Sequence, residues 1–398
     1  MRILYDLSVL RTEARTRGIG RYVATLGEGL ADDLAHPSQL ASAGSGHELV
    51  GLSRLRSYGR AELTHDVRGE VQRLSALKKR ESHASWAYRL RLHLARATRK
   101  LRPDVFHQGH PNATPLGKLG CPRVVTAHDL IPLRYPGRYL DWRDGWAPGR
   151  RRLDGRRYRS ADHVIAISEA TASDLVSLLK ISAKKISVVY NGVDLALWSP
   201  EPQPHDLRVR SQLGVDDKCY VLYVGAADWR KNFEGMLQAV IEARRAAPEL
   251  ELILVWAASL DATTQARLRQ RLREASAEDA VKLVGYVSDQ DLGALLRGAV
   301  AQLFVSRAEG FGYPIVEAMA AGCPVITSNL SSMAEVAAQA AITVDPEDHH
   351  AIADAIVLFA DNATERRRFA AAGVARANYF SVARMARGTI DAYSEVSR

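Results

Sequence analysis

The chain has 398 residues, of which 47% are hydrophobic and 25% charged, and this ordinary globular composition excludes disordered, collagenous and coiled-coil proteins. Because a domain usually contains ~100–200 residues, the length predicts two domains. The net charge of +9 is unevenly distributed, since residues 1–200 contain 33 Lys and Arg against 19 Asp and Glu (+14) while residues 201–398 contain 21 against 26 (−5), so we expect the first half to favour an anionic partner or surface.

The first half alternates short apolar strands with helical segments. A strand at residues 2–7 precedes an Arg-rich loop, Gly18, Gly20 and then a helix whose apolar residues recur at helical spacing. Ser168 is predicted to cap the helix that follows a later strand. Further strands are predicted at residues 48–52, 103–107, 124–126, 161–167 and 186–190. Strands that alternate with helices indicate βαβ units and a parallel sheet.

The alternation restarts after a Pro-rich segment at residues 200–204, which we predict to be a linker. Asn232 is predicted to cap a helix with an apolar face that begins at Phe233. The strands predicted in this half lie at residues 220–224, 250–256, 281–284, 302–305 and 324–327. Both halves are therefore predicted to be doubly wound α/β domains. The cleft between them is the expected ligand site, because such sheets bind ligands outside the carboxyl ends of their strands.

The most specific motif runs from Glu309 to Gly322, between a predicted strand and a helix that Pro314 can open and Gly322 can close. Two glycines in it let backbone N–H groups approach an anion such as pyrophosphate at the helix N-terminus. Glu309 and Glu317 flank this anion site, and because ionised carboxylates only accept hydrogen bonds, they suit the hydroxyl groups of a sugar and a ribose. The alternative is a tight strand-to-helix turn with incidental acids.

This motif resembles the E-x7-E motif of the retaining glycosyltransferases of family 4, which have the GT-B fold of two Rossmann-like domains facing across a cleft. The resemblance implies that Glu309 contacts the donor sugar near its reacting carbon and that Glu317 binds the ribose. Segments similar to the family's other donor loops imply that Arg230 and Lys231 hold the donor diphosphate and that the nucleobase meets the backbone at Val287. The residues expected to line the diphosphate within the motif are Gly310, Phe311 and Gly312.

Two segments of the first half also resemble this family. Gly18 and Gly20 resemble the Gly-rich loop that faces the donor diphosphate in this family. A dinucleotide-binding fingerprint would need a small residue where Val23 stands, which argues against NAD as a ligand. His128 is similar to the family's loop histidine, which implies that it donates to a sugar hydroxyl or steadies the transition state, and its ordinary pKa would allow either protonation state near neutral pH. A structural role is expected for His107 and His110.

The resemblance implies an acceptor domain at residues 1–198, a donor domain at residues 199–379, and a last helix at residues 380–398 that packs back on the first domain. The implied reaction is the retaining transfer of a hexose from a nucleoside-diphosphate sugar to a hydroxyl of a lipid-linked or polysaccharide acceptor. The opening segment most resembles mannosyl- and rhamnosyltransferases of bacterial polysaccharide assembly, which favours GDP-mannose or a related donor. No cofactor and no metal are expected, because GT-B enzymes can use Arg, Lys and helix N-termini on the leaving diphosphate.

The sequence departs from the family pattern at Trp229 and at Arg307-Ala308, which leaves the donor sugar open. Two other classes remain as alternatives: a GT-B-like sugar-nucleotide epimerase, against which the spacing of Glu309 and Glu317 argues, and a non-catalytic protein that binds a nucleotide-sugar or a glycan.

The basic charge of the first half is concentrated in two segments. Residues 78–102 are predicted to form a basic helix with an apolar stripe, and residues 138–159 add two tryptophans and further arginines. One interpretation is contact with an anionic membrane face or with a lipid-diphosphate acceptor. The other is an amphipathic helix packed on its own sheet beside an Arg-rich loop. Nucleic acid is not expected as a partner, because no binding motif accompanies the charge.

Location and redox state are also constrained. No apolar run approaches the ~18 residues that span a bilayer, and the first residues lack the pattern of a secretory signal. We therefore expect a cytoplasmic protein, which could lie on the inner face of the cell membrane. The three cysteines, Cys121, Cys219 and Cys323, are too far apart in sequence to indicate a disulfide framework or a paired-cysteine metal site.

Overall fold

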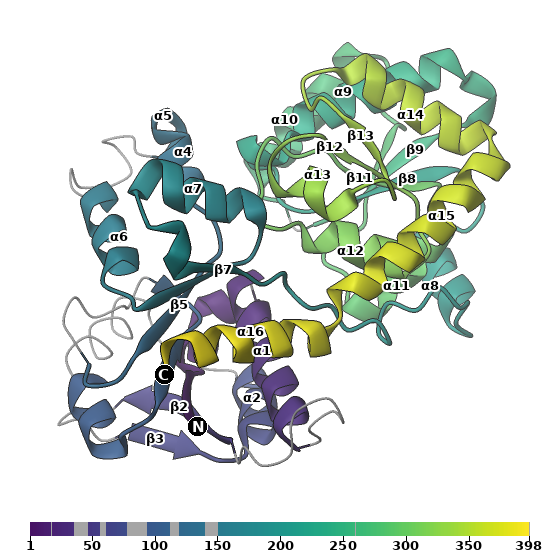
Figure 1. The fold of residues 1–398 in the computed structure, drawn as a ribbon. Coiled ribbons are helices and arrows are strands. Elements are labelled where there is room, and N and C mark those ends of the chain that lie inside the picture. Colours follow the sequence, from purple (N-terminus) through teal and green to yellow (C-terminus); the bar gives the residue numbers. More distant parts are fainter. Residues whose placement is uncertain are drawn as a thin grey trace. The chain divides into compact units, whose positions relative to one another are not determined.

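The computed structural model describes residues 1–16, 18–35, 47–55, 61–77, 94–111, 119–139, 150–258 and 260–397, which form two compact units (Figure 1). Unit 1 consists of Met1–Gly192 and Ser381–Arg398, and unit 2 consists of Val193–Phe380. The chain passes between the units at Gly192 and Val193, so the linker predicted at residues 200–204 is misplaced. That segment lies inside unit 2, where Pro200 packs against Gly322.

Unit 1 is built on a seven-stranded sheet in the order β3-β2-β1-β4-β5-β6-β7. Every neighbouring pair is parallel except β2 and β3. The central strands are buried along their whole length, as expected of a parallel sheet covered on both faces. The strands are β1 (Arg2–Asp6), β2 (Glu48–Leu55), β3 (Ala61–Thr64), β4 (Val105–Gln108), β5 (Arg123–Ala127), β6 (His163–Ala166) and β7 (Ile186–Val188).

The helices of unit 1 include the end of the chain. The C-terminal helix α16 (Val382–Val396) packs against α1 (Gly18–Ala35), as Figure 1 shows. The contact is close, because a Cβ atom on Gly29 would lie 2.6 Å from a methyl carbon of Val382. The other helices are α2 (Val67–Ser75), α4 (Ile131–Arg134), α5 (Pro136–Tyr139), α6 (Arg150–Arg159) and α7 (Glu169–Leu179), and residues 94–101 are also helical.

Unit 2 contains a six-stranded sheet in the order β10-β9-β8-β11-β12-β13, with every pair parallel. Counted from β8, this is the order 3-2-1-4-5-6 of nucleotide-binding sheets, in which the chain reverses direction across the sheet between the first and fourth strands. The strands are β8 (Tyr220–Val224), β9 (Ile253–Ala257), β10 (Val281–Leu283), β11 (Ala301–Phe304), β12 (Val325–Ser328) and β13 (Ile342–Val344). The predicted pair of doubly wound α/β domains is confirmed.

The helices of unit 2 bury their apolar faces against this sheet. In α9, for example, the ring of Phe233 stacks on that of Trp256 from β9, with the ring centroids 4.0 Å apart. The helices are α8 (Asp206–Leu213), α9 (Phe233–Ala246), α10 (Ala262–Glu274), α11 (Asp289–Gly298), α12 (Tyr313–Ala320), α13 (Ser331–Ala337), α14 (His349–Asp361) and α15 (Ala363–Ala377).

Two predicted helix caps have different outcomes. The Ser168 hydroxyl accepts from the backbone N–H of Thr171 at the start of α7, which confirms that cap. Asn232 occupies the N-cap position of α9, as predicted, but its side chain makes no capping bond. Asn232 instead adopts a left-handed conformation (φ 53°) and donates from its buried amide nitrogen to the carbonyl of Pro346.

Candidate functional site

The candidate site of unit 2 lies where its sheet reverses order. β8 and β11 are neighbouring strands, so the segments that follow them leave the same carboxyl edge of the sheet. The first segment, residues 225–232, carries Arg230 and Lys231, and the second, residues 305–312, carries Glu309. Ligands of doubly wound sheets bind at this kind of position.

The structure brings three of the predicted site residues into direct contact. Arg230 Nη1 lies 2.8 Å from Glu309 Oε2, and Lys231 Nζ lies 2.7 Å from Glu309 Oε1. The Glu309 side chain is only 10% exposed, against 14% for Lys231 and 28% for Arg230. Charge-assisted hydrogen bonds at such a partly buried site are stronger than those of an exposed surface pair. A single carboxylate thus neutralises one charge of the two cations.

The backbone around these residues fixes the two segments together. The Arg307 N–H donates to the carbonyl of Arg230 at 2.7 Å, and the hydroxyls of Ser331 and Ser332 donate to the carbonyl of Glu309 at 2.7 and 2.9 Å. Asp228 accepts from the Arg230 N–H at 2.9 Å. Each segment is therefore held by hydrogen bonds that do not depend on a ligand.

The two departures from the family pattern lie against each other in this structure. The guanidinium carbon of Arg307 lies 5.6 Å from the ring centroid of Trp229, within cation–π distance. Arg307 also donates from Nη1 to the carbonyl of Trp229 at 2.8 Å and pairs with Glu347. Arg307 therefore lies beside the candidate site, and its contact with Trp229 could not be predicted from either departure alone.

Residues 310–312 form the turn into α12. Gly312 has φ +100°, a conformation that favours glycine, and α12 begins directly after it with Pro314 in its first turn. The helix ends as predicted, because Gly322 at φ +71° donates to the carbonyl of Met319 while Cys323 donates to that of Ala318. At the other end of α12, Pro314 has no N–H and the Ile315 N–H donates to the Gly312 carbonyl at 3.0 Å, so the first turn of the helix has few N–H groups to offer an anion.

The side chains of Phe311 and Glu317 are more buried than their predicted contacts with the donor would require. Phe311 is 3% exposed, and its ring packs edge-on against those of Tyr313 and Phe380 at centroid distances of 5.4 and 5.6 Å. Its backbone, rather than its ring, is therefore the part that could face a diphosphate. Glu317 lies in the second turn of α12 and is 3% exposed.

Val287 follows β10 in the turn after Gly285 and is partly buried. β10 lies two strands from β8, so Val287 is at the same carboxyl edge as the other donor residues but on a different loop.

The predicted glycines of unit 1 occupy different environments at the start of α1. Gly18 is exposed, and a Cβ atom built on it meets nothing within 4 Å. Gly20 is buried, and a Cβ atom there would lie 2.4 Å from the backbone of Arg15. Gly20 is thus required for packing against the preceding turn, whereas the position of Gly18 has room for a side chain.

His128 follows β5 and is 9% exposed. Its Nε2 lies 2.7 Å from the carbonyl oxygen of Gly109, and because a carbonyl only accepts, Nε2 carries the proton. Burial lowers the pKa of His128 to about 4, partly opposed by the Gly109 hydrogen bond. The expectation that both protonation states exist near neutral pH is therefore wrong here. The neutral ring presents Nδ1 as an acceptor, so a donated hydrogen bond to a sugar hydroxyl would require Nε2 to leave Gly109.

A chain of buried hydrogen bonds leads from His107 to Tyr22, whose ring contacts His128. His107 on β4 contacts the hydroxyl of Tyr393 from α16 through Nδ1 at 2.6 Å and the hydroxyl of Thr126 through Nε2 at 2.8 Å. Thr126 also lies 2.8 Å from the hydroxyl of Tyr22, whose ring packs edge-on against His128. Burial lowers the pKa of His107 to about 3, so it is neutral, in agreement with its predicted structural role.

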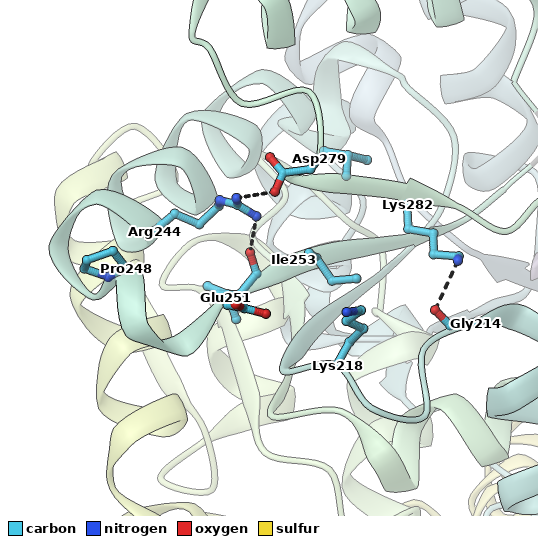
Figure 2. Close-up of a pocket in the computed structure, with 10 residues that line it drawn as sticks. Gly214, Lys218, Arg244, Pro248, Glu251, Ile253, Asp279 and Lys282 are labelled. Atoms are coloured by element: carbon cyan, nitrogen blue, oxygen red, sulfur yellow. Dashed lines mark hydrogen bonds and ion pairs between the residues drawn. The ribbon is translucent and has the colours of Figure 1, made fainter.

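A cavity of about 630 Å³ lies elsewhere in unit 2 (Figure 2). Its wall includes Lys218, Ile253 and Val281, which stand at the amino ends of β8, β9 and β10. Two of the cations that line it are engaged, since Arg244 donates to Asp279 at 2.7 Å and Lys282 donates to the Gly214 carbonyl at 3.1 Å. It lies at the edge of the sheet opposite to the candidate site, where ligands of this architecture do not bind.

Part of the basic first half lies outside the described residues, namely Arg17, residues 78–93 and residues 140–149. The described remainder of the predicted basic helix buries Leu94 and Ala97 within unit 1. For residues 94–101 this supports packing on the unit's own sheet rather than an apolar face open to a membrane. Among the described helices, none is both long and apolar enough to cross a membrane.

Two family models match the chain, one in each unit. Residues 16–197 match the model described as Glycosyltransferase Family 4, and residues 207–376 match the one described as Glycosyl transferases group 1. The two matches together leave uncovered only the ends of the chain and residues 198–206, which lie in unit 2.

Individual relatives agree with these matches. The O-antigen chain mannosyltransferase B of Escherichia coli is 32% identical over 238 residues, which are 59% of this chain and 61% of that protein. The glycogen synthase of Mycobacterium tuberculosis is 27% identical over an alignment covering 96% of this chain and 92% of that protein. Among solved structures, Anabaena HepE in complex with UDP and glucose superimposes with a TM-score of 0.71 and 17% identity over 99% of both chains, a likeness of fold.

Proposed function

Because the chain belongs to the glycosyltransferases of family 4 and group 1, we propose that it transfers a hexose, mannose or a closely related sugar, from a nucleoside-diphosphate sugar with retention of configuration. The acceptor is a hydroxyl of a lipid-linked or polysaccharide glycan. Similarity to an O-antigen mannosyltransferase supports mannose and a GDP-linked donor. Similarity to a glycogen synthase keeps glucose donors within the range to be tested.

One observation carries this proposal: the contact of Glu309 with both Arg230 and Lys231 beside the N-terminus of α12. Two cations and the backbone amides of Gly310 to Gly312 are the donors that we assign to a diphosphate, since Arg forks onto phosphate oxygens and Lys supplies a point charge. A carboxylate among them is of no use for binding phosphate. It is placed to act on a sugar attached to that phosphate.

In the proposed reaction the bond between the anomeric carbon and the diphosphate oxygen breaks while a bond to the acceptor oxygen forms on the same face of the sugar. The acceptor proton passes to the departing diphosphate. Arg230, Lys231 and the backbone amides of Gly310 to Gly312 stabilise the charge that the diphosphate gains. Glu309 faces the sugar and stabilises the positive charge growing at its anomeric carbon, and neutral His128 accepts a hydrogen bond from a sugar hydroxyl through Nδ1. No metal or cofactor is required in this scheme.

The test is to incubate the protein with GDP-, UDP- and dTDP-sugars and a series of lipid-linked and free glycan acceptors, then to measure nucleotide release and the anomeric configuration of the product. We expect acceptor-dependent nucleotide release and a product with the configuration of the donor. An inverted product would refute the retaining mechanism. Conversion of a sugar nucleotide to its epimer would instead support an epimerase, and binding without turnover for every donor would support a non-catalytic binding protein.

Matched variants distinguish the site from general loss of structure. Arg230→Ala and Lys231→Ala should each abolish most donor binding. Arg244→Ala is the control, because Arg244 is also paired with a carboxylate but lies at the opposite edge of the same sheet. Equal loss of donor binding in the control would contradict the assignment.

We also propose that the basic segment at residues 78–102 attracts the acceptor's lipid-diphosphate or an anionic membrane face. The support is the +14 charge of the first half. Replacing its Lys and Arg by Gln should reduce use of lipid-linked acceptors and binding to anionic vesicles, while donor binding is kept. The control removes the arginines of α10, namely Arg267, Arg269, Arg271 and Arg273. An equal effect in both proteins would refute a specific role for the segment.

A further inference from the structure

A cluster of imidazole and carboxylate groups lies on the packed pair of helices α9 and α14, away from the residues of the candidate donor site. His349 Nδ1 is 3.0 Å and His350 Nδ1 is 3.1 Å from the same oxygen, Oε2 of Glu242. One ligand atom from each of the three residues lies within 4.8 Å of the others. The proposed transfer reaction uses none of them.

The cluster is held in place by the fold. Glu242 lies near the end of α9 with its side chain 18% exposed, and Gln238 donates from its amide to the second carboxylate oxygen, Oε1, at 2.8 Å. Asp348 caps α14 by accepting from the N–H of Ala351, which fixes the first turn that carries both histidines. Hydrogen bonds from Gln238 and His349 outweigh burial and lower the pKa of Glu242, so the carboxylate is ionised.

We propose that Glu242, His349 and His350 form a binding site for a divalent transition metal ion, with Zn²⁺ as the representative ion. Two imidazole nitrogens and one carboxylate oxygen are a ligand set that suits Zn²⁺, and water would complete the coordination. In a tetrahedral zinc site with bonds of ~2.0–2.1 Å, neighbouring ligand atoms are ~3.3 Å apart. The two separations of 3.0 and 3.1 Å are close to that value, so little movement is needed. Metal binding requires both rings to carry their proton on Nε2.

The consequence of metal binding is a cross-link between α9 and α14. Both helices begin next to the donor segments: Asn232 at the start of α9 donates to the Pro346 carbonyl, and Glu347 just before α14 pairs with Arg307. The ion would therefore stabilise the part of unit 2 that supports the Arg230 segment. It would act on stability rather than on the chemical step.

The experiment is calorimetric titration of ZnCl₂ into the full chain, prepared without a polyhistidine tag, stripped with a chelator and held in a non-coordinating buffer. We expect one ion per chain at micromolar affinity and a Tm raised by several degrees in excess Zn²⁺, because a ligand that binds only the folded state stabilises it. The double variant His349→Ala/His350→Ala should weaken this binding at least tenfold and lose the Tm shift. Glu242→Gln, which keeps the size of the side chain, should weaken it too.

His65→Ala is the matched control, since His65 also lies beside a single carboxylate, that of Glu48 at 3.5 Å, but has no second histidine. It should bind Zn²⁺ like the original chain. Unchanged stoichiometry and affinity in the double variant, or the absence of a saturable site in the original chain, would overturn the proposal. In the second case the cluster is a pair of imidazole hydrogen bonds to Glu242. Neither result affects the proposed glycosyl transfer.

Discussion

The pairing of Glu309 with Arg230 and Lys231 predicts that donor binding and turnover respond in opposite directions to one substitution. In the structure, the Glu309 carboxylate contacts both cations. A diphosphate that binds them must displace it, so part of its binding energy is spent on breaking those contacts. Glu309→Gln removes the competing charge while keeping the shape of the side chain. We therefore expect tighter binding of the nucleoside diphosphate but much slower transfer.

The magnitude follows from the contacts. A hydrogen bond to a charged group contributes ~1.5–3 kcal/mol. Glu309, whose side chain is 10% exposed, makes one such bond with Arg230 and an ion pair with Lys231. The glutamine retains one acceptor oxygen, so about half of that interaction persists, and relief of ~1–2 kcal/mol corresponds to roughly 5–30-fold tighter binding. Arg230→Ala removes one cation outright and should weaken binding by ~1.5–3 kcal/mol, which is roughly 10–150-fold.

The assay is calorimetric titration of GDP and UDP into each variant, combined with kcat from nucleotide release. Glu347→Gln is the control, because Glu347 pairs with the neighbouring Arg307 but is 64% exposed, and it should change the affinity by less than ~3-fold. Weaker diphosphate binding in Glu309→Gln, comparable to that in Arg230→Ala, would refute the idea of competition. Unchanged kcat in Glu309→Gln would refute the role of the carboxylate in the reaction.

Two further predictions concern unit 1. Gly20→Ala should destabilise it by ~1–3 kcal/mol in urea unfolding, because the new Cβ would lie 2.4 Å from the Arg15 backbone, whereas Gly18→Ala has open space and should cost nothing; equal effects would contradict this account. Acidification from pH 6 to pH 4 should also destabilise the fold. His107 and His128, with pKa values lowered by burial to about 3 and about 4, each bind a proton on unfolding, while Asp6, whose pKa burial raises to about 6, releases one. The balance of one proton corresponds to ~1.4 kcal/mol per pH unit, and urea unfolding that is as stable or more stable at pH 4 would refute it.

Local patterns were sufficient to predict most of the fold. Strands such as Tyr220–Val224 are short apolar runs bounded by polar loops, and the GT-B architecture that the motifs imply agrees with the likeness to a solved structure over 99% of the chain. The sequence analysis missed β3 and β13. In β3 (Ala61–Thr64) the alternation of apolar and polar residues is weak, and the strand pairs antiparallel at the edge of its sheet. β13 (Ile342–Val344) has three residues, which are too few for a periodic signal.

The sequence was sufficient to predict which residues lie at the candidate site, but not that their charges are paired with one another. Arg230, Lys231 and Glu309 could be identified because each follows a strand and belongs to a local motif. The pairing of their charges depends on β8 and β11 being neighbouring strands. Because 79 residues separate Arg230 from Glu309, no local sequence pattern indicates that these strands are neighbours. The neutral state of His128 likewise depends on the distant Gly109 carbonyl and on burial.

The pairing of Glu309 with two cations bears on how the candidate site would select a nucleotide-linked sugar. A carboxylate already paired with two cations has little negative charge to offer a sugar, so before the diphosphate arrives it cannot stabilise a positive anomeric carbon. On the proposed function, a diphosphate that takes the cations would leave the carboxylate without them at a position where it is 10% exposed, and an uncompensated charge would act strongly there. A free sugar lacking the diphosphate would meet a carboxylate that is still paired with Arg230 and Lys231. In that arrangement the specificity for a nucleotide-linked sugar arises from the release of Glu309 as well as from contacts to the nucleotide.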